Sequence, residues 1–157
     1  VDQMAHLWAN YRLFFLNEPK YRRIVRALNY FDVGYHISRA EHRHLTFHAA
    51  LESLICTKEP KKNRLEVTTR LPKFSSCVST AQAEAIYKLC CEIKHEAAPM
   101  FRHPTSNGVT DPRDVARLKD TELLENALRD IFRKSILDPD FAAKLCKVKR
   151  LRKEDPV

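Results

Sequence analysis

The chain has 157 residues, 44% of them hydrophobic, and a formal net charge of +8 at pH 7. This size and apolar content suit one domain built around a single core. Only 2 residues are glycine, which argues against an all-β fold because tight hairpin turns depend on glycine. The sequence has neither an apolar run of membrane-spanning length nor a signal peptide pattern, so we expect no membrane partner and a cytoplasmic location.

Two helices are predicted in the first part of the chain. The first covers about residues 3–16. Asn17 is then predicted to cap the second helix, because Glu18 and Pro19 follow it in positions that a first turn favours. Apolar residues recur at helical spacing from there until about Gly34, where this helix is expected to end.

A central helix is predicted between Ser38 and about Cys56. Ser38 and Glu41 have the spacing of a capping box, which marks a helix start. The second half of this helix is apolar nearly all round, so we expect its neighbours to bury it. A short helix follows over about residues 64–71 and is expected to stop before Pro72.

Capping signals also divide the second half of the chain. Ser79 and Gln82 resemble a second capping box, and the helix that they begin is expected to end shortly before Pro99. Two Asp-Pro pairs, at residues 111–112 and 138–139, mark the starts of further helices.

Together these elements predict an all-α fold, an up-and-down bundle of about six helices. Residues 1–157 are expected to form a single helical domain that ends in a basic C-terminal tail, residues 146–157. The chain begins with Val1 in place of Met, so we expect it to be a fragment of a longer protein.

Basic residues gather in three stretches of the sequence. They are Lys20, Arg22, Arg23 and Arg26; Lys58, Lys61, Lys62 and Arg64; and Lys144, Lys147, Lys149, Arg150, Arg152 and Lys153. Positive charge of this density favours polyanionic partners, nucleic acids first among them. A solvated basic surface with a loose tail explains the same composition, so charge alone leaves both interpretations open.

The cysteines and histidines give little support to a metal site. The five cysteines are odd in number and lack a CxxC pair, so neither a disulfide framework nor a zinc knuckle is expected, and a reducing compartment fits better. A group of acidic and histidine residues three or four apart shares one helix face, a spacing that zinc sites use: Glu41, His44, His48 and Glu52. No HExxH motif accompanies them and a third ligand would have to come from elsewhere, so we expect no metal and no other cofactor.

Two features of the stretch YKLCCEIKHEAAP, residues 87–99, are candidates for chemistry. Cys91 and His95 are one helical turn apart and could pair as nucleophile and base, although two cysteines on an amphipathic helix are more often small core residues. His95 lies close to a helix end, where an imidazole can transfer protons near neutral pH or serve as a C-terminal cap. On the residues alone, the cap is the favoured interpretation.

Four segments follow one another in the order of a known family. They are ALESLI at residues 50–55 with Glu52, LEVTTRLPKF at 65–74 with Arg70, IYKLCCEIKHEA at 86–97 with Tyr87, Ile93 and His95, and ELLENALRDIFRKSI. The third segment resembles the pattern Y-x-x-R-S-x-I-x-H-G. In this order the chain resembles the HEPN superfamily, specifically its Apea-like branch, over about residues 26–145. The resemblance implies a dimer in which two such helices meet in a cleft.

Active members of this family are metal-independent ribonucleases, and the resemblance implies that His95 transfers protons there. The family places an arginine before the histidine with four to six residues between them, and the planar fork of arginine suits a phosphate. This chain has Cys90 at the arginine position and Glu96 at the glycine position. A thiol is a weak donor without fixed charge, and losing one transition-state donor typically costs about 3–4 kcal/mol. Lys88 would replace the arginine if its helix turned it to the side of His95.

The resemblance therefore implies a non-catalytic or weakly catalytic RNA-associated module of a defence or toxin-like protein. RNA, a second copy of the chain, and an antitoxin or fused domain are the expected partners. The alternatives are an active metal-independent endoribonuclease, with Lys88 or Arg70 as the cation, and a purely structural dimerisation domain. The candidate catalytic residues are His95, Lys88 and Cys90, and the candidate RNA-binding or supporting residues are Glu52, Arg70, Tyr87, Lys94 and Arg102. For Glu52 and Arg70, a buried ion pair that fixes helix packing is the favoured interpretation.

Overall fold

The computed structural model describes residues 2–57, 62–95 and 112–147, and for residues 2–7 the backbone alone. This part of the chain forms α-helices and contains no strand. The helices are α1 (Asp2–Leu16), α2 (Glu18–Tyr35), α3 (Ala40–Ile55), α4 (Asn63–Phe74), α5 (Thr80–His95), α6 (Pro112–Leu137) and α7 (Pro139–Cys146). The all-α prediction is confirmed, with seven helices in the described residues in place of about six.

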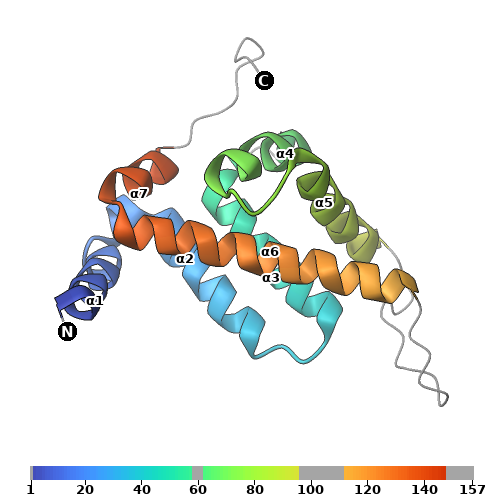
Figure 1. Ribbon diagram of the computed structural model, residues 1–157, viewed down its shortest axis with the longest axis horizontal. Coiled ribbons are helices and arrows are strands. Elements are labelled where there is room, and N and C mark those ends of the chain that lie inside the picture. The colour runs from blue at the N-terminus through green and yellow to red at the C-terminus, as the bar shows by residue number, and fades with distance from the viewer. Residues whose placement is uncertain (1, 58–61, 96–111, 148–157) are drawn as a thin grey trace, which may run out of the picture.

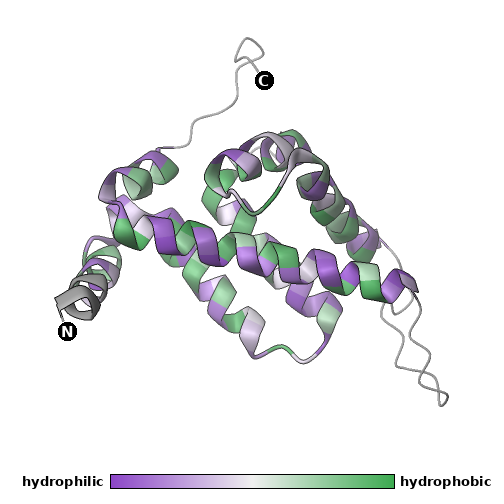
Figure 2. Ribbon diagram, viewed as in Figure 1, coloured by the Kyte–Doolittle hydropathy of each residue, from purple (hydrophilic) through white to green (hydrophobic). Residues whose placement is uncertain are grey.

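Helix α3 lies at the centre of the bundle, as its apolar sequence predicted. It packs against α2, α4, α5, α6 and α7, and Figure 1 shows α6 crossing in front of it. Its apolar side chains Phe47, Leu51, Leu54 and Ile55 are fully buried. Helix α6 has one core-facing side, whereas its outward side is mostly hydrophilic in Figure 2. Removal of these α3 side chains from water by five neighbouring helices contributes to the hydrophobic stabilisation of the fold.

The capping predictions for α5 and α7 agree with the structure. Asp111, which was expected to start α6, lies outside the described residues. The Ser79 amide donates to Gln82 Oε1 at 2.9 Å, and the Gln82 amide approaches Ser79 Oγ at 3.3 Å. The Asp138 carboxylate accepts from the amides of Asp140 and Phe141 at 2.8 and 3.1 Å. These bonds satisfy amides that lack a partner inside the helix.

The capping predictions for α2 and α3 are wrong in detail. Asn17 occupies the N-cap position of α2 but makes no side-chain capping bond; its side-chain amide donates instead to the Leu13 carbonyl at 3.2 Å. Asn17 therefore closes α1. At α3 the N-cap position falls on Arg39, which also makes no side-chain capping bond, and Ser38 precedes it. Packing of α2 against α3 fixes both helices without these caps.

Helix α4 was predicted to stop before Pro72. In the structure it continues through Pro72 to Phe74. A proline inside a helix removes one backbone hydrogen bond and crowds the preceding turn. The last turn is held by other contacts, because the Phe74 ring packs edge-on against Phe141 of α7 and Leu71 beside it is fully buried. Tertiary packing overrides the local preference here.

Gly34, near the end of α2, is expected to tolerate no larger residue. A Cβ there would meet Phe47 Cδ1 at 2.6 Å and Cε1 closer still, and the buried Phe47 ring is held between the rings of Phe31 and Tyr35. Helix propensity alone would make Gly34→Ala favourable by about 1 kcal/mol. We expect the clash to prevail and the free energy of unfolding to fall by about 1–3 kcal/mol.

Urea unfolding of Gly34→Ala measures this effect. The exposed neighbour Val33 supplies the control, because Val33→Ala removes surface side-chain atoms and should change stability by about 0.5 kcal/mol or less. A Gly34→Ala variant as stable as the parent would show that Phe47 moves aside without cost.

Candidate functional site

His95 is the last described residue of α5, and its side chain is exposed. It shares the last turn of the helix with Lys94, where positive charge is favoured by the helix dipole. Within the described residues its side chain has no hydrogen-bond or ion-pair partner. Both interpretations made from the sequence, a helix cap and a proton-transfer group open to a ligand, are compatible with this position.

Lys88 lies on the same face of α5 as His95. The two are seven residues apart, which corresponds to about 700° of helical rotation, and so they point within about 20° of one another and about 10 Å apart along the axis. The Lys88 side chain is 74% exposed, and its ammonium lies 3.8 Å from Glu92 Oε1. Glu92 in turn lies 3.8 Å from Arg117 of α6. The helix therefore turns Lys88 to the side of His95, but a carboxylate stands between them.

Cys90 points into the core, on the other side of α5 from His95. Its side chain is 1% exposed and shares the buried face with Ala83, Ile86 and Leu89. Burial raises the pKa of the Cys90 thiol to about 11, so the group is neutral at physiological pH. Because it has no access to a ligand in solvent, we set Cys90 aside as a catalytic residue.

Two of the predicted RNA-binding or supporting residues, Glu52 and Tyr87, meet at a residue that was not among them, and the charge of Lys94, a third, helps to lower the pKa of that residue. This is His48 of α3, whose ring lies 5.6 Å from the Tyr87 ring and whose Nδ1 lies 3.5 Å from Glu52 Oε1. Glu52 also accepts a hydrogen bond from Asn63 at 3.0 Å. Burial raises the pKa of Tyr87 to about 12. The spacing of His48 and Glu52, one turn apart on α3, was the sequence signal for this contact.

Arg70 is a buried structural residue, and the predicted ion pair between Glu52 and Arg70 is wrong. The Arg70 guanidinium lies 3.1 Å from Glu66 Oε1 and donates to the Ile55 carbonyl at 2.6 Å. Glu66 is fully buried, and its carboxylate also accepts from the amide and the hydroxyl of Thr57, both at 2.7 Å. Glu66, the partner that the sequence analysis missed, precedes Arg70 by four residues, which is the spacing of a helical ion pair.

Two of the predicted features lie outside the described residues, namely Arg102 and most of the basic tail, residues 148–157. In the described ranges, no cluster of three or more histidine, cysteine or acidic side chains could hold a metal ion. None of the described helices is both long enough and apolar enough to cross a membrane. All five cysteines are free thiols.

Two buried histidines, His44 and His48, should make stability depend on pH. Burial lowers the pKa of His44 from 6.5 to about 4, although its ring nitrogens lie 3.0 Å from Thr121 Oγ1 and 3.3 Å from the Ile86 carbonyl. Burial, with smaller contributions from His44 and Lys94, lowers the pKa of His48 to about 3. Neither His48 ring nitrogen has a hydrogen-bond partner among the described residues. Both imidazoles are therefore neutral in the folded protein at pH 7.

The free energy of unfolding should consequently fall as the pH drops below 6.5. Between about pH 6.5 and pH 4 the unfolded chain binds protons that the folded chain does not, which costs about 1.4 kcal/mol per pH unit for each histidine. Urea unfolding at several pH values from 7 to 5 measures the slope, and His48→Leu should reduce it by about half. A stability that stays constant over this range would contradict neutral burial of the two rings.

Comparison of the chain with protein family models, with curated proteins and with solved structures finds no match. Its function is therefore inferred from its own residues and their geometry.

Proposed function

We propose that the protein is a HEPN-type, RNA-associated module of a defence or toxin-like system that binds RNA and cleaves it weakly or not at all. The burial of Cys90, 1% exposed, is the observation on which the catalytic part of this proposal depends. Where the family pattern has its phosphate-binding arginine, this chain has a neutral side chain that solvent does not reach. The net charge of +8 supports affinity for RNA.

Cleavage of RNA by its own 2′-hydroxyl needs a base, an acid and a cation for the charge that develops on phosphorus. His95 is exposed and can transfer a proton. Lys88 is the cation on the same face of α5 as His95, but Glu92 lies close enough to offset the charge of Lys88. An ammonium group also lacks the two-point fork of arginine. With the cation weakened, a rate loss of a few hundredfold or more is expected.

The position of Lys88 also favours a second candidate function, an active metal-independent endoribonuclease that uses His95. Lys88 and His95 share one exposed face of α5, as this candidate requires. Arg70, the other cation considered for this role, is buried and paired with Glu66, so it supports the fold and has no access to RNA. The active form of the proposal therefore requires Lys88.

A homodimer, a partner antitoxin or fused domain, and a cytoplasmic location complete the proposal. A HEPN-like dimer would bring the two His95 side chains into one cleft, so its contacts have to lie near the end of α5. Large exposed apolar side chains lie both at the start of α6, where Val115 and Leu118 are exposed, and on α1, where Trp8 and Leu16 are the most exposed of the described side chains. Helix α1 lies at the opposite end of the long axis from the end of α5 in Figure 1. A dimer through α1 would hold the two His95 residues apart and would favour the third interpretation, a structural dimerisation domain.

Incubation of the purified chain with end-labelled single-stranded RNA in EDTA tests the catalytic part. We expect the RNA to stay intact, or to be cut so slowly that His95→Ala makes little difference. Rapid cleavage that disappears in both His95→Ala and Lys88→Ala, with products ending in 2′,3′-cyclic phosphate, would establish the active enzyme instead. Arg133→Ala is the control, because Arg133 is an exposed cation of α6.

A further inference from the structure

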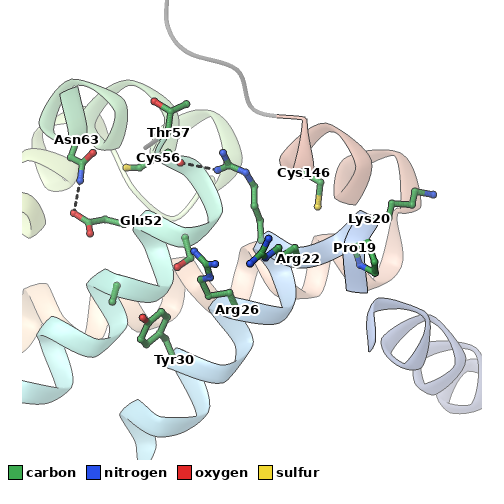
Figure 3. A pocket seen from close by; sticks show the side chains of 13 residues that line it. Pro19, Lys20, Arg22, Arg26, Tyr30, Glu52, Cys56, Thr57, Asn63 and Cys146 are labelled. Atoms are coloured by element: carbon green, nitrogen blue, oxygen red, sulfur yellow. Dashed lines mark hydrogen bonds between the residues drawn. The ribbon is translucent and has the colours of Figure 1, made fainter. Parts of the chain in front are cut away.

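An open groove with a basic floor runs along α2, away from the His95 face of α5. Its volume is about 560 Å³, and it is bounded by α2, the end of α3, the start of α4 and Cys146 of α7. Among the described residues, its lining has four cations from α2, namely Lys20, Arg22, Arg23 and Arg26, and one carboxylate, Glu52. Sites for small ligands typically have volumes of about 300–1,000 Å³. Figure 3 shows Lys20 toward one end of α2 and Tyr30 toward the other.

Arg23 supplies a fixed positive charge at this groove. Its guanidinium donates to the Leu54 carbonyl at 3.3 Å and to the Cys56 carbonyl at 2.8 Å, so it is held at the end of α3. Within the described residues no carboxylate pairs with it, and burial lowers its pKa. Neutral carbonyl groups thus hold the Arg23 side chain in place without cancelling its charge.

Arg22 and Arg26 add two exposed guanidinium groups one helical turn apart. In the described part of the chain neither has an ion-pair or hydrogen-bond partner. Like charges at this spacing repel one another and reduce helix stability slightly, so helix stability does not explain the arrangement. Arginine is well suited to a phosphate, because two parallel N–H groups can bind two of its oxygens.

The rest of the groove indicates how a phosphate-bearing ligand would be oriented. Glu52 is already engaged by Asn63 and lies near His48, and its negative charge disfavours an anion on that side. Tyr30 is 41% exposed and follows Arg26 by one turn, where its ring could stack on a base. The phosphate is thus directed to the arginines and an attached base to Tyr30.

We propose that this groove binds the phosphate of a nucleotide, with Arg22 and Arg26 as direct ligands and Arg23 as the fixed charge behind them. The phosphate belongs either to an RNA strand or to a free nucleotide. If the phosphate belongs to RNA, the inference rests on the proposed function. It then places the contact between the protein and RNA on α2, away from the candidate residues of α5.

The test compares two double variants of the full chain with the same loss of charge. Arg22→Ala/Arg26→Ala removes the proposed ligands, and Lys119→Ala/Arg133→Ala removes two exposed cations of α6. Each protein is titrated with a fluorescent single-stranded RNA at several salt concentrations and with AMP by calorimetry. We expect the groove variant to lose roughly tenfold in RNA affinity and about 2 units of salt slope, and the control variant to stay within about twofold of the parent.

The two ligands separate the sources of the phosphate. RNA binding that depends on the groove, without AMP binding, supports the site with RNA as its ligand. AMP binding that disappears in the groove variant, without RNA binding by the parent, supports a free nucleotide and refutes the proposed function alone. Equal loss in both double variants, no loss in the groove variant, or no binding of either ligand by the parent would overturn the site. Circular dichroism of each variant confirms that it is folded.

Discussion

Glu66→Ala is expected to lower the free energy of unfolding by about 3–5 kcal/mol, because removal of one partner of a buried ion pair typically costs this much. Glu66 is fully buried and pairs with the almost equally buried Arg70 at 3.1 Å. Its carboxylate also fixes Thr57, two residues after the end of α3, through two hydrogen bonds of 2.7 Å. The substitution leaves the Arg70 charge in the core without its carboxylate and releases both Thr57 donors at once.

Glu84→Ala is the matched control for this prediction. Glu84 forms an ion pair with Arg64, but that pair lies at the surface, and exposed pairs contribute about 0–1 kcal/mol. Urea unfolding of both variants at pH 7 gives the comparison. Equal losses in the two variants would show that the contact of Glu66 with Arg70 is not a main support of the fold.

Cys90→Arg is expected to destabilise the protein by at least about 3 kcal/mol and to confer no ribonuclease activity. The substitution restores the arginine of the family pattern, but at a position whose side chain is 1% exposed and faces the core. A guanidinium group at this position is much larger than the thiol, and it would bury a charge among apolar side chains. Thermal or urea unfolding and the RNA cleavage assay measure the two effects.

Lys88→Arg tests the same chemistry on the exposed face. Position 88 is 74% exposed, so this variant should keep the stability of the parent within about 0.5 kcal/mol. It places an arginine on the same face of α5 as His95. If either variant gains RNA cleavage, we expect it to be Lys88→Arg and not Cys90→Arg. A Cys90→Arg protein that is as stable as the parent and cleaves RNA in a His95-dependent way would show that the buried position of Cys90 is not the functional one.

The sequence predicted the helices well where a local signal was sufficient. The Ser79–Gln82 capping box and the Asp138 cap form the bonds that their spacing indicated. The helix through Pro72 was not predictable in this way, because packing of Phe74 on Phe141 outweighs the lost backbone bond. Local preference marks helix ends reliably only where no tertiary contact of larger energy opposes it.

The candidate site was less predictable, because packing of the helices decides which side chains point to the core and which to solvent. The sequence favoured core positions for the adjacent cysteines, and Cys90 does point into the core, but the sequence left open whether α5 turns Lys88 to the side of His95. Arg70 was assigned to Glu52, eighteen positions away, although Glu66 stood one turn before it. The basic stretch from Lys20 to Arg26 was a sequence signal for a polyanion site, but the groove along α2 combines residues of four helices, and their meeting depends on how the helices pack.

The salt dependence of RNA affinity tests the central claim most directly. The full chain is titrated with a labelled single-stranded RNA in EDTA at a series of salt concentrations, and the RNA is recovered from each sample and sized on a gel. Binding by phosphate contacts predicts an affinity that falls steeply and linearly on a logarithmic salt scale, with the RNA recovered at full length. Absence of measurable binding at low salt, or an affinity that salt leaves unchanged, would contradict a role in binding RNA.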